Sequence, residues 1–303
     1  RRSSDLAALA LASVTSERTL GTFAKALILE ELAAVDPGAA LALDGLVLVG
    51  PLLIASGVEL GSAVSRAGAR GVLVHDTERR FRAEGGVVAG AHPWVPADRA
   101  DVVVILQGDR ALVVTSGFDL VPIDACGLGA AGASRLCVTS APVVATIEEP
   151  STLVRARAQV HTRVAALLTG AARGAYEYAV RYARERTAFG CPIAHHQALA
   201  FLIADMATGV DVARAMTWAS AVTIDEGNDA AWASAAAFAE AAEQGLFVGP
   251  NAVQILGGHG YMKDHLVEKW MRDIRTLAQC AGGRDEAEIA SAALVVDHDL
   301  GFR

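Results

Sequence analysis

The sequence predicts a mainly helical protein with a central β domain, and three observations support this prediction. Apolar residues make up 53 % of the 303 residues but aromatic residues only 5 %, so Ala, Leu and Val must build most of the core, as in close-packed helices. Both ends of the chain repeat their apolar residues at helical spacing. The middle instead holds short runs of Val and Ile broken by Gly, Pro and Asp, which is typical of strands.

The elements are expected in the order helix, strand, helix. Residues 3–57 read as helices, with a turn at Asp36-Pro37-Gly38. From about residue 69, "RGVLVHD", "GVVAGAH", "ADVVVILQGDRALVVTS" and "CVTSAPVVATIEE" predict a compact antiparallel β domain. After Pro150, long amphipathic segments predict helices of about 25 residues or more in a four-helix bundle. The predicted domains are residues 1–68, a truncated helical domain, 69–150, the β domain, and 151–303, the helical bundle.

Composition argues against several classes of protein. The net charge of -8 and the pI near 5.5 argue against a nucleic-acid partner. No apolar run reaches the ~18 residues of a membrane span, and no signal peptide is visible, so we expect a cytoplasmic protein. The chain does not start with Met, which indicates a processed chain or part of one. The cysteines lack zinc spacing and are expected to be reduced, mostly buried thiols: Cys126, Cys137, Cys191 and Cys280.

Two motifs in the C-terminal region carry chemical information. The first, "RERTAFGCPIAHHQ", contains Arg186, Phe189, Gly190 and Gln197. The second, "QILGGHGYMKDHLVEKWMRDIR", begins at Gln254 and places three glycines before a charged segment. It is not a dinucleotide fingerprint, because Lys263 stands where a further glycine is needed, and it lacks the Gly-Lys-Ser/Thr of a P-loop. Glycines in such a place let a ligand approach the backbone, and a phosphate is the first candidate.

Together, the two motifs resemble the C-terminal helical domain of the acyl-CoA dehydrogenases. The resemblance is close over residues 155–283, loose over the β domain and truncated over the first 68 residues. It implies the family's fold, with a helical domain, a β domain and a C-terminal four-helix bundle. It also implies FAD bound across a subunit interface, with the flavin ring on one subunit and the ADP half gripped by its neighbour.

The resemblance assigns the ADP half of FAD to six residues: Arg186, Phe189, Gln197, Gln254, Gly257 and Gly258. Arg186 would fork onto the pyrophosphate with charge-assisted hydrogen bonds, and Phe189 would offer the cofactor an apolar face. The two glycines would expose backbone N–H groups. Ordinary structural interpretations also exist, namely a solvated or ion-paired arginine and a helix C-cap followed by a turn.

Two further groups of residues are expected to be structural. Glu268, Arg272 and Asp273 stand at i, i+4 and i+5, which predicts an ion-pair cluster on a helix surface. His195 and His196 are adjacent but have no other ligand at metal-binding spacing, so no metal site is expected.

Both positions at which the family carries its catalytic base lack a carboxylate. The Glu that usually follows the Arg-Asp pair corresponds to Ala281. The alternative position, near the start of the first long C-terminal helix, corresponds to Val160, followed by His161 instead of Arg. No catalytic residue is therefore assigned to this chain, unless a displaced carboxylate such as Asp285 or Glu286 serves.

The flavin-ring side is depleted as well. The loop that holds the flavin pyrimidine in the family has no counterpart near residues 60–80. The family's Trp-Ile-Thr-Asn landmark corresponds to Trp94-Val95-Pro96-Ala97. Pro96 replaces the Thr that bonds flavin N5, and proline offers neither a hydroxyl nor an N–H group.

This asymmetry predicts a division of labour between two chains. The chain would be the non-catalytic subunit of an α2β2 FAD-dependent acyl-CoA dehydrogenase, whose homologous partner supplies the base, the flavin-ring contacts and most of the acyl-CoA site. The Ala/Arg/Val-rich composition suits a high-GC bacterium, and such enzymes act in actinobacterial steroid side-chain catabolism. Two alternatives stay open: a homomeric flavoenzyme with a displaced base, and a non-enzymatic scaffold derived from a dehydrogenase. Loss of a general base typically costs about 10²–10⁴-fold in rate, which disfavours an unassisted homomer.

Overall fold

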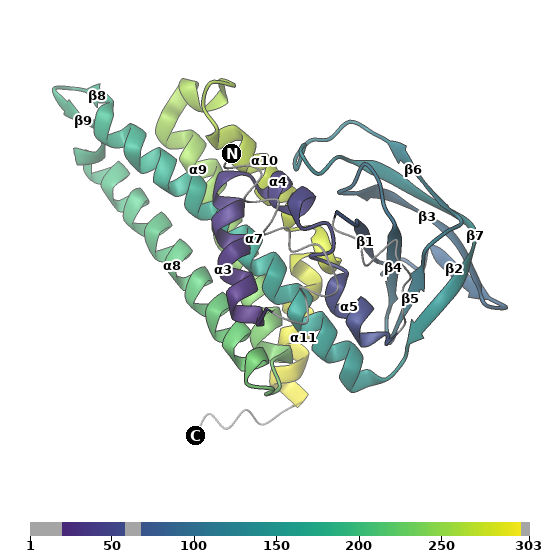
Figure 1. The fold of residues 1–303 in the computed structure, drawn as a ribbon. Coiled ribbons are helices and arrows are strands. Elements are labelled where there is room, and N and C mark those ends of the chain that lie inside the picture. The colour runs from purple at the N-terminus through teal and green to yellow at the C-terminus, as the bar shows by residue number, and fades with distance from the viewer. Residues whose placement is uncertain (1–19, 58–67, 298–303) are drawn as a thin grey trace.

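The computed structural model describes residues 20–57 and 68–297, with a helical body flanked on one side by a β domain (Figure 1). Three short helices come first: α3 (Thr22–Val35), α4 (Pro37–Leu43) and α5 (Gly50–Ala55). The turn expected at Asp36 is confirmed, because Asp36 ends α3 and its carboxylate accepts a hydrogen bond of 3.0 Å from the Ala39 N–H, which caps α4. Residues 3–19 of the predicted helical region lie outside the described residues.

The β domain is one seven-stranded sheet in the order β1-β4-β5-β7-β3-β2, with β6 also pairing with β7. Its strands are β1 (Gly71–His75), β2 (Phe81–Glu84), β3 (Val87–Val95), β4 (Val102–Gln107), β5 (Arg110–Val114), β6 (Phe118–Pro122) and β7 (Ser134–Ile147). The long strand β7 pairs with β3 and β6 through its first part and with β5 through its last part, so it joins the two halves of the sheet. A largely antiparallel β domain is thus confirmed.

The pairing of β1 with β4 is a correction, because these two strands are parallel. The hairpin β2–β3 lies between them in the chain and provides the crossover that parallel strands need. Strands β2 and β6 are two further differences from the sequence prediction. Their sequences, "FRAE" and "FDLVP", are short and hold only one Val and no Ile between them, and pairing with β3 and β7 orders them.

The C-terminal region is the predicted bundle of long helices (Figure 1). Three of them are α7 (Pro150–Glu185), α8 (Gln197–Asp225) and α9 (Ala231–Leu256). Two shorter helices, α10 (Val267–Leu277) and α11 (Arg284–Asp297), pack on α9 and together fill the fourth position of the bundle. They are separated by a 3-10 turn, Cys280–Gly282, which contains Ala281. The first strand begins at Gly71 and α7 at Pro150, close to the boundaries drawn from the sequence, but the division into domains stays a prediction.

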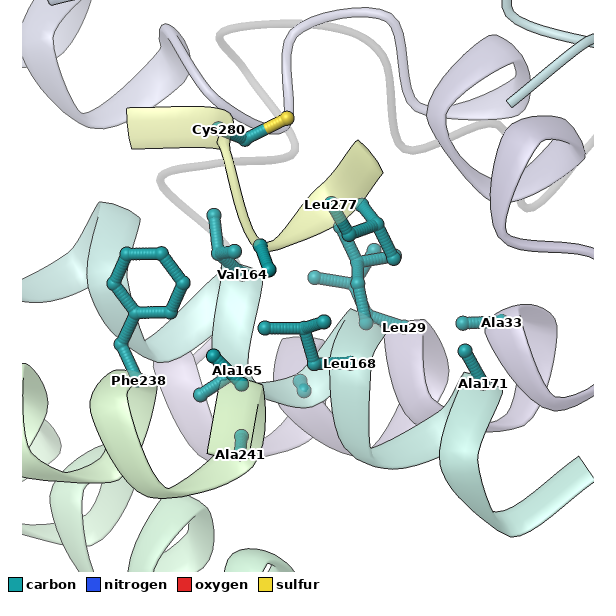
Figure 2. Packing of buried hydrophobic residues seen from close by; sticks show 14 of the residues in the cluster. Leu29, Ala33, Val164, Ala165, Leu168, Ala171, Phe238, Ala241, Leu277 and Cys280 are labelled. Carbon is teal, nitrogen blue, oxygen red and sulfur yellow. The ribbon is translucent and has the colours of Figure 1, made fainter. Parts of the chain in front are cut away.

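Helix α3 packs closely along α7, because small residues line the contact. A Cβ atom built on Gly170 or Gly174 would lie 2.2 Å from a carbonyl oxygen of α3. Figure 2 shows Ala33 of α3 and Ala171 of α7 in the same packed cluster, where both are fully buried. The core is therefore built from small side chains that bring backbones together, as the low aromatic content predicts.

Helix α3 is also held by polar groups from the far end of α8. The carboxylate of Asp225 accepts hydrogen bonds from the N–H groups of Thr22 (2.6 Å) and Phe23 (2.9 Å), which satisfies the first turn of α3. The buried Glu30 of α3 is paired with Arg214 at 2.9 Å. These contacts fix the short N-terminal region on the bundle.

Candidate functional site

The first motif forms a hairpin at one end of the bundle (Figure 1). Its strands, β8 (Thr187–Ala188) and β9 (Cys191–Pro192), are joined by Phe189 and Gly190, which both have positive φ, 54° and 85°. Glycine adopts this conformation freely, but for phenylalanine it costs roughly 1–2 kcal/mol. Phe189 is also 97 % exposed. A bulky apolar side chain held in a strained turn and facing solvent indicates contact with something outside this chain.

Arg186 lies at the root of this hairpin. It ends α7, and its N–H donates to the Tyr182 carbonyl oxygen at 2.8 Å. Its side chain is exposed, and within residues 20–57 and 68–297 the guanidinium has no ion pair or hydrogen bond. Arg186 therefore has no ion-pair partner in the described part of the chain, and the ordinary interpretation as a surface ion-pair residue lacks support there. Gln197, the first residue of α8, is exposed beyond the same hairpin.

The second motif forms the turn that ends α9. Gln254 is exposed in the last turn of the helix, and Gly257 follows with a φ of 58° and a ψ of -134°, a conformation that requires glycine. The C-cap interpretation is therefore correct for Gly257. Gly258 has no positive φ, and a Cβ atom there would meet nothing within 4 Å. The fold alone does not explain a glycine at 258, whereas a ligand lying on the backbone would.

Two tyrosine–histidine pairs bring the two motifs to the same end of the bundle. The hydroxyl oxygen of Tyr182 lies 2.7 Å from Nδ1 of His259, and that of Tyr178 lies 2.9 Å from Nδ1 of His265. Tyr182 is one turn before Arg186 on α7, while His259 belongs to the glycine turn. The six residues predicted to grip the ADP half are all exposed: Arg186, Phe189, Gln197, Gln254, Gly257 and Gly258.

The two positions expected to carry a base lie together, away from these motifs. Val160 on α7 is buried, and Ala281 is half-buried in the turn before α11. Both line one largely apolar pocket of about 280 Å³. Of the two displaced carboxylates considered, Glu286 lines this pocket and the exposed Asp285 does not.

A larger polar cleft of about 830 Å³ opens next to this pocket. Three residues line both spaces and form a neck between them: His75, Arg157 and Glu286. The guanidinium of Arg157 donates to the carbonyl oxygen of Gly108 at the turn between β4 and β5. The cleft mixes three arginines and four carboxylates, namely Arg79, Arg110, Arg157, Asp76, Asp109, Glu148 and Glu286. The pair of spaces suits a ligand with an apolar end and a polar arm.

The two imidazoles at the pocket are held in the neutral form. Burial, followed by the positive charge of Arg157 and by His75, lowers the pKa of His161 from 6.5 to about 4. The pKa of His75 is also lowered, mainly by burial and then by Arg157. Burial lowers the pKa of the Arg157 guanidinium as well. The pocket end is therefore a desolvated environment in which neither imidazole carries a charge near neutral pH.

The residues around Pro96 and Ala281 do not fit a flavin ring. The cavity lined by Pro96 has a volume of about 30 Å³, which is room for about one water molecule. The imidazole of His75 packs against Gly282, since a Cβ atom on that glycine would lie 2.0 Å from His75 Nδ1. The ADP end, by contrast, offers an open backbone, an unpaired guanidinium and an exposed aromatic ring, and these fit the ADP half of FAD. The flavin loop was expected to be absent near residues 60–80, and of these, residues 60–67 lie outside the described residues.

The predicted ion-pair cluster on α10 is confirmed for Glu268 and Arg272, whereas Asp273 is ion-paired with Lys269 but does not lie on the helix surface. Arg272 bonds to Glu268 at 2.8 Å, one turn apart. Asp273 is instead buried, and it accepts hydrogen bonds of 2.6 Å from the Leu128 N–H and from Lys269 Nζ. The loop around residue 128 covers this face of α10, so Asp273 anchors the β domain to the bundle.

The other sequence expectations concern cysteines, metals and membranes. The four cysteines are free, but only Cys280 is buried and Cys126 is exposed, so the expectation of mostly buried thiols is wrong. His196 Nε2 lies 3.2 Å from the carbonyl oxygen of Ala188. Within the described ranges no three His, Cys, Asp or Glu residues form a group that could hold a metal ion. Nor does any helix of residues 20–57 or 68–297 have the length and apolarity to cross a membrane.

Sequence reasoning missed the neck residues His75 and Arg157. They come from β1 and α7, and only the fold brings them next to Glu286. One signal was available: His161 stands where the family pattern has an arginine, and Arg157 lies one turn earlier on the same helix face.

Comparisons with known proteins agree with this geometry. The family model of the "Acyl-CoA dehydrogenase, C-terminal domain" matches residues 155–294. The cyclohex-1-ene-1-carbonyl-CoA dehydrogenase of Geobacter metallireducens is 42 % identical over 112 residues, which are 37 % of this chain and 30 % of that protein. The matched part thus spans less than a third of this curated relative's length.

Solved structures extend the likeness to most of the chain. Butyryl-CoA dehydrogenase from Megasphaera elsdenii has a TM-score of 0.77 at 22 % identity, over 94 % of this chain and 82 % of that one. A glutaryl-CoA dehydrogenase from Mycobacterium smegmatis in complex with FADH2 has a TM-score of 0.78 at 17 % identity, over 94 % and 82 %. Such identities show the fold alone. The chain therefore has the acyl-CoA dehydrogenase fold, and its residues 155–294 match the C-terminal domain of that family.

Proposed function

We propose that this chain is a subunit of a heteromeric FAD-dependent acyl-CoA dehydrogenase, to which it contributes the contacts for the ADP half of the cofactor. A homologous partner chain supplies the catalytic base and the flavin-ring contacts and binds most of the acyl-CoA, as expected for an α2β2 assembly. The substrate class is an acyl-CoA thioester, with a steroid side-chain ester as the leading candidate, and the setting is the cytoplasm.

The observation that carries the proposal is the difference between the two ends of the bundle. The ADP end keeps Arg186, Phe189 and Gly258 exposed, and among the described residues no group bonds the Arg186 guanidinium and no neighbour requires a glycine at 258. The other end has Val160 and Ala281 where a carboxylate is required. If two kinds of subunit share each active site, one kind can keep the ADP half-site and lack the catalytic half-site. This chain has that combination.

The reaction explains which parts this chain cannot supply. In α,β-dehydrogenation a carboxylate takes a proton from the α carbon, and the flavin accepts a hydride from the β carbon. Methyl groups at positions 160 and 281 accept no proton. What this chain does supply is binding: a guanidinium for phosphate oxygens, backbone N–H groups at the glycine turn and an apolar face at the hairpin tip.

The test is purification of the chain alone and together with the chain encoded by the adjacent gene. Alone, the protein should show almost no flavin absorbance, because the space beside Pro96 is too small for the ring. The co-purified complex should be yellow and active and should contain half as many flavins as subunits. A yellow, active homotetramer with one FAD per chain would contradict the proposal.

The homomeric alternative keeps one specific observation in its favour, the carboxylate of Glu286. It lies at the neck between the apolar pocket and the polar cleft, next to both empty base positions. If it were a displaced base, Glu286→Gln would abolish dehydrogenation by the chain alone, and the matched change Asp285→Asn on the exposed neighbour would not. Under the heteromeric proposal neither change alters turnover of the complex by more than a few-fold.

A further inference from the structure

Four side chains link the two cofactor motifs and have no role in the function proposed above. This aromatic cluster consists of Tyr178, Tyr182, His259 and His265. The rings of the two histidines stack with their centroids 5.6 Å apart and their planes at 21°. The Tyr182 ring meets both imidazoles edge-on, at 6.0 and 5.8 Å.

The hydrogen bonds of the cluster determine what each imidazole can offer. Nδ1 of each histidine is occupied by a tyrosine hydroxyl, at 2.7 Å for His259 and 2.9 Å for His265. When the phenol O–H donates to Nδ1, the ring proton resides on Nε2. Nε2 lies across each ring from Nδ1, so both N–H donors face away from the tyrosines of α7.

The position of the cluster places these donors at the ADP end. His259 directly follows Gly258 and is exposed, whereas His265 is half-buried. The cluster's Tyr182 receives the hydrogen bond of the Arg186 N–H on its carbonyl oxygen. Among the described residues no carboxylate bonds to either imidazole, and the guanidinium of Arg181 lies over the Tyr178 ring at 6.0 Å. Two aligned N–H donors beside a free backbone turn and arginine side chains form a surface that favours an anion.

We propose that His259, supported by His265, is a direct ligand of the cofactor pyrophosphate through its Nε2–H group. Tyr178 and Tyr182 act as positioning residues, because their hydroxyls fix the imidazole tautomer and the ring orientation. The inference rests on the proposed function, since it adds a contact to the same ADP half-site.

The experiment uses the full chain and ADP as the probe, because ADP carries the pyrophosphate without the flavin. Binding of ADP is followed by broadening of its ³¹P resonances during titration, and binding of adenosine, which lacks phosphate, by broadening of its adenine ¹H resonances. Two substitutions separate the two nitrogen atoms of the ring. His259→Gln keeps an N–H donor near the place of Nε2 but loses the bond to Tyr182, and His259→Asn keeps an amide near Nδ1 but has no group at Nε2.

The expected result is ADP binding by the natural chain that weakens about tenfold in His259→Asn but less than about threefold in His259→Gln, as for the loss of one hydrogen bond to a charged group. Tyr182→Phe should weaken binding by about threefold, and this effect should vanish in the Asn background. Equal loss in both His259 variants would show that the histidine only packs the turn, and would overturn the inference. Unchanged binding in both variants would overturn it as well.

The proposed function fails in a different way. If neither the natural chain nor Arg186→Ala binds ADP or adenosine, the chain has no ADP half-site. That result contradicts the proposed function and not only the role of His259. Thermal unfolding of each variant identifies those that do not fold. The same two substitutions can then be made at the second histidine, as His265→Gln and His265→Asn.

Discussion

The two ends of the helical bundle differ in how they meet solvent. At the hairpin end Phe189 is 97 % exposed, and no atom lies within 4 Å of a Cβ built on Gly257 or Gly258 in the glycine turn. At the pocket end most of the lining side chains are apolar, and burial lowers the pKa values of His75 and His161. The first end exposes groups that suit a ligand, and the second places buried neutral imidazoles beside a pocket without a carboxylate at positions 160 and 281.

This difference separates binding from catalysis within one fold. A cofactor contact requires exposed hydrogen-bond donors and a backbone that side chains do not cover. Proton abstraction requires a carboxylate at one point, and a methyl group removes it entirely. Four substitutions test this difference between the two ends of the bundle, and they follow from the largest expected effect to the smallest.

The largest effect should appear in the acid stability of the pocket end. His161 is neutral in the folded chain and takes a proton only near pH 4, whereas the unfolded chain takes it near 6.5. As the pH falls between these values the unfolded state binds more protons, so the free energy of unfolding decreases, by about 3 kcal/mol in total at 1.36 kcal/mol per pKa unit. The lowered pKa of His75 acts in the same direction.

The measurement is urea unfolding from pH 8 to pH 4 for the natural chain and for His161→Gln. The variant should lack the share of the acid dependence that comes from His161, about 3 kcal/mol, while the difference between the two chains at pH 8 reports packing alone. Parallel profiles for the two proteins would show that His161 is not the group responsible.

The next effect concerns Arg186 at the hairpin end. A hydrogen bond to a charged group is worth about 1.5–3 kcal/mol, so Arg186→Ala should weaken FAD binding by the co-purified complex at least tenfold. Flavin fluorescence during dilution of the complex gives the affinity. Arg184→Ala, two residues earlier and also exposed, is the matched control and should have less than a twofold effect. Equal losses in both variants would mean that general positive charge, and not a specific contact, holds the cofactor.

A smaller effect is expected in the stability of the turn at Ala281. Its φ of 54° and ψ of 32° are left-handed, a conformation that costs an L-residue roughly 1–2 kcal/mol. Ala281→Gly should therefore raise the free energy of unfolding by about 0.5–1 kcal/mol once the greater chain entropy of glycine is subtracted. Ala290→Gly, inside helix α11, should have the opposite sign, by about 1 kcal/mol. The melting temperature should rise in Ala281→Gly and fall in Ala290→Gly, each relative to the natural chain.

No effect on turnover is expected when a carboxylate is restored at the same position. Ala281→Glu should give no gain in dehydrogenation by the complex, because His75 packs against Gly282 and the cavity beside Pro96 is small. Acyl-CoA oxidation with a flavin-coupled dye measures this, with FAD content checked in parallel. An increase in rate would reveal a flavin site on this chain.

The long helices and several strands could be predicted from the sequence, because short-range residue patterns determine them. Apolar spacing predicted α7, α8 and α9, and clusters of Val and Ile predicted β3 and β4. Strand β2 escaped prediction because it is ordered by its partner, and the parallel β1–β4 pair because register between distant segments leaves no local trace.

The same limit applies to the candidate site. The motifs around Arg186 and Gly257 are contiguous in sequence, so their residues could be named in advance. The neck of His75, Arg157 and Glu286 joins three segments that lie far apart in the chain, and no spacing rule connects them. The burial of Asp273 was missed for a related reason, since helix spacing identifies neighbours on the helix but not the loop that covers it.

The cap on α3 has a consequence for how the protein is made. The carboxylate of Asp225 is synthesised 203 positions after Thr22, whose N–H it accepts. At about 5–20 residues per second on the ribosome, α3 waits roughly ten to forty seconds for this cap, whereas Glu30 can pair with Arg173 before Arg214 has been made. The first described helix to be translated therefore gains its main packing partner, α7, before the cap of its first turn, which is complete only when α8 has been made.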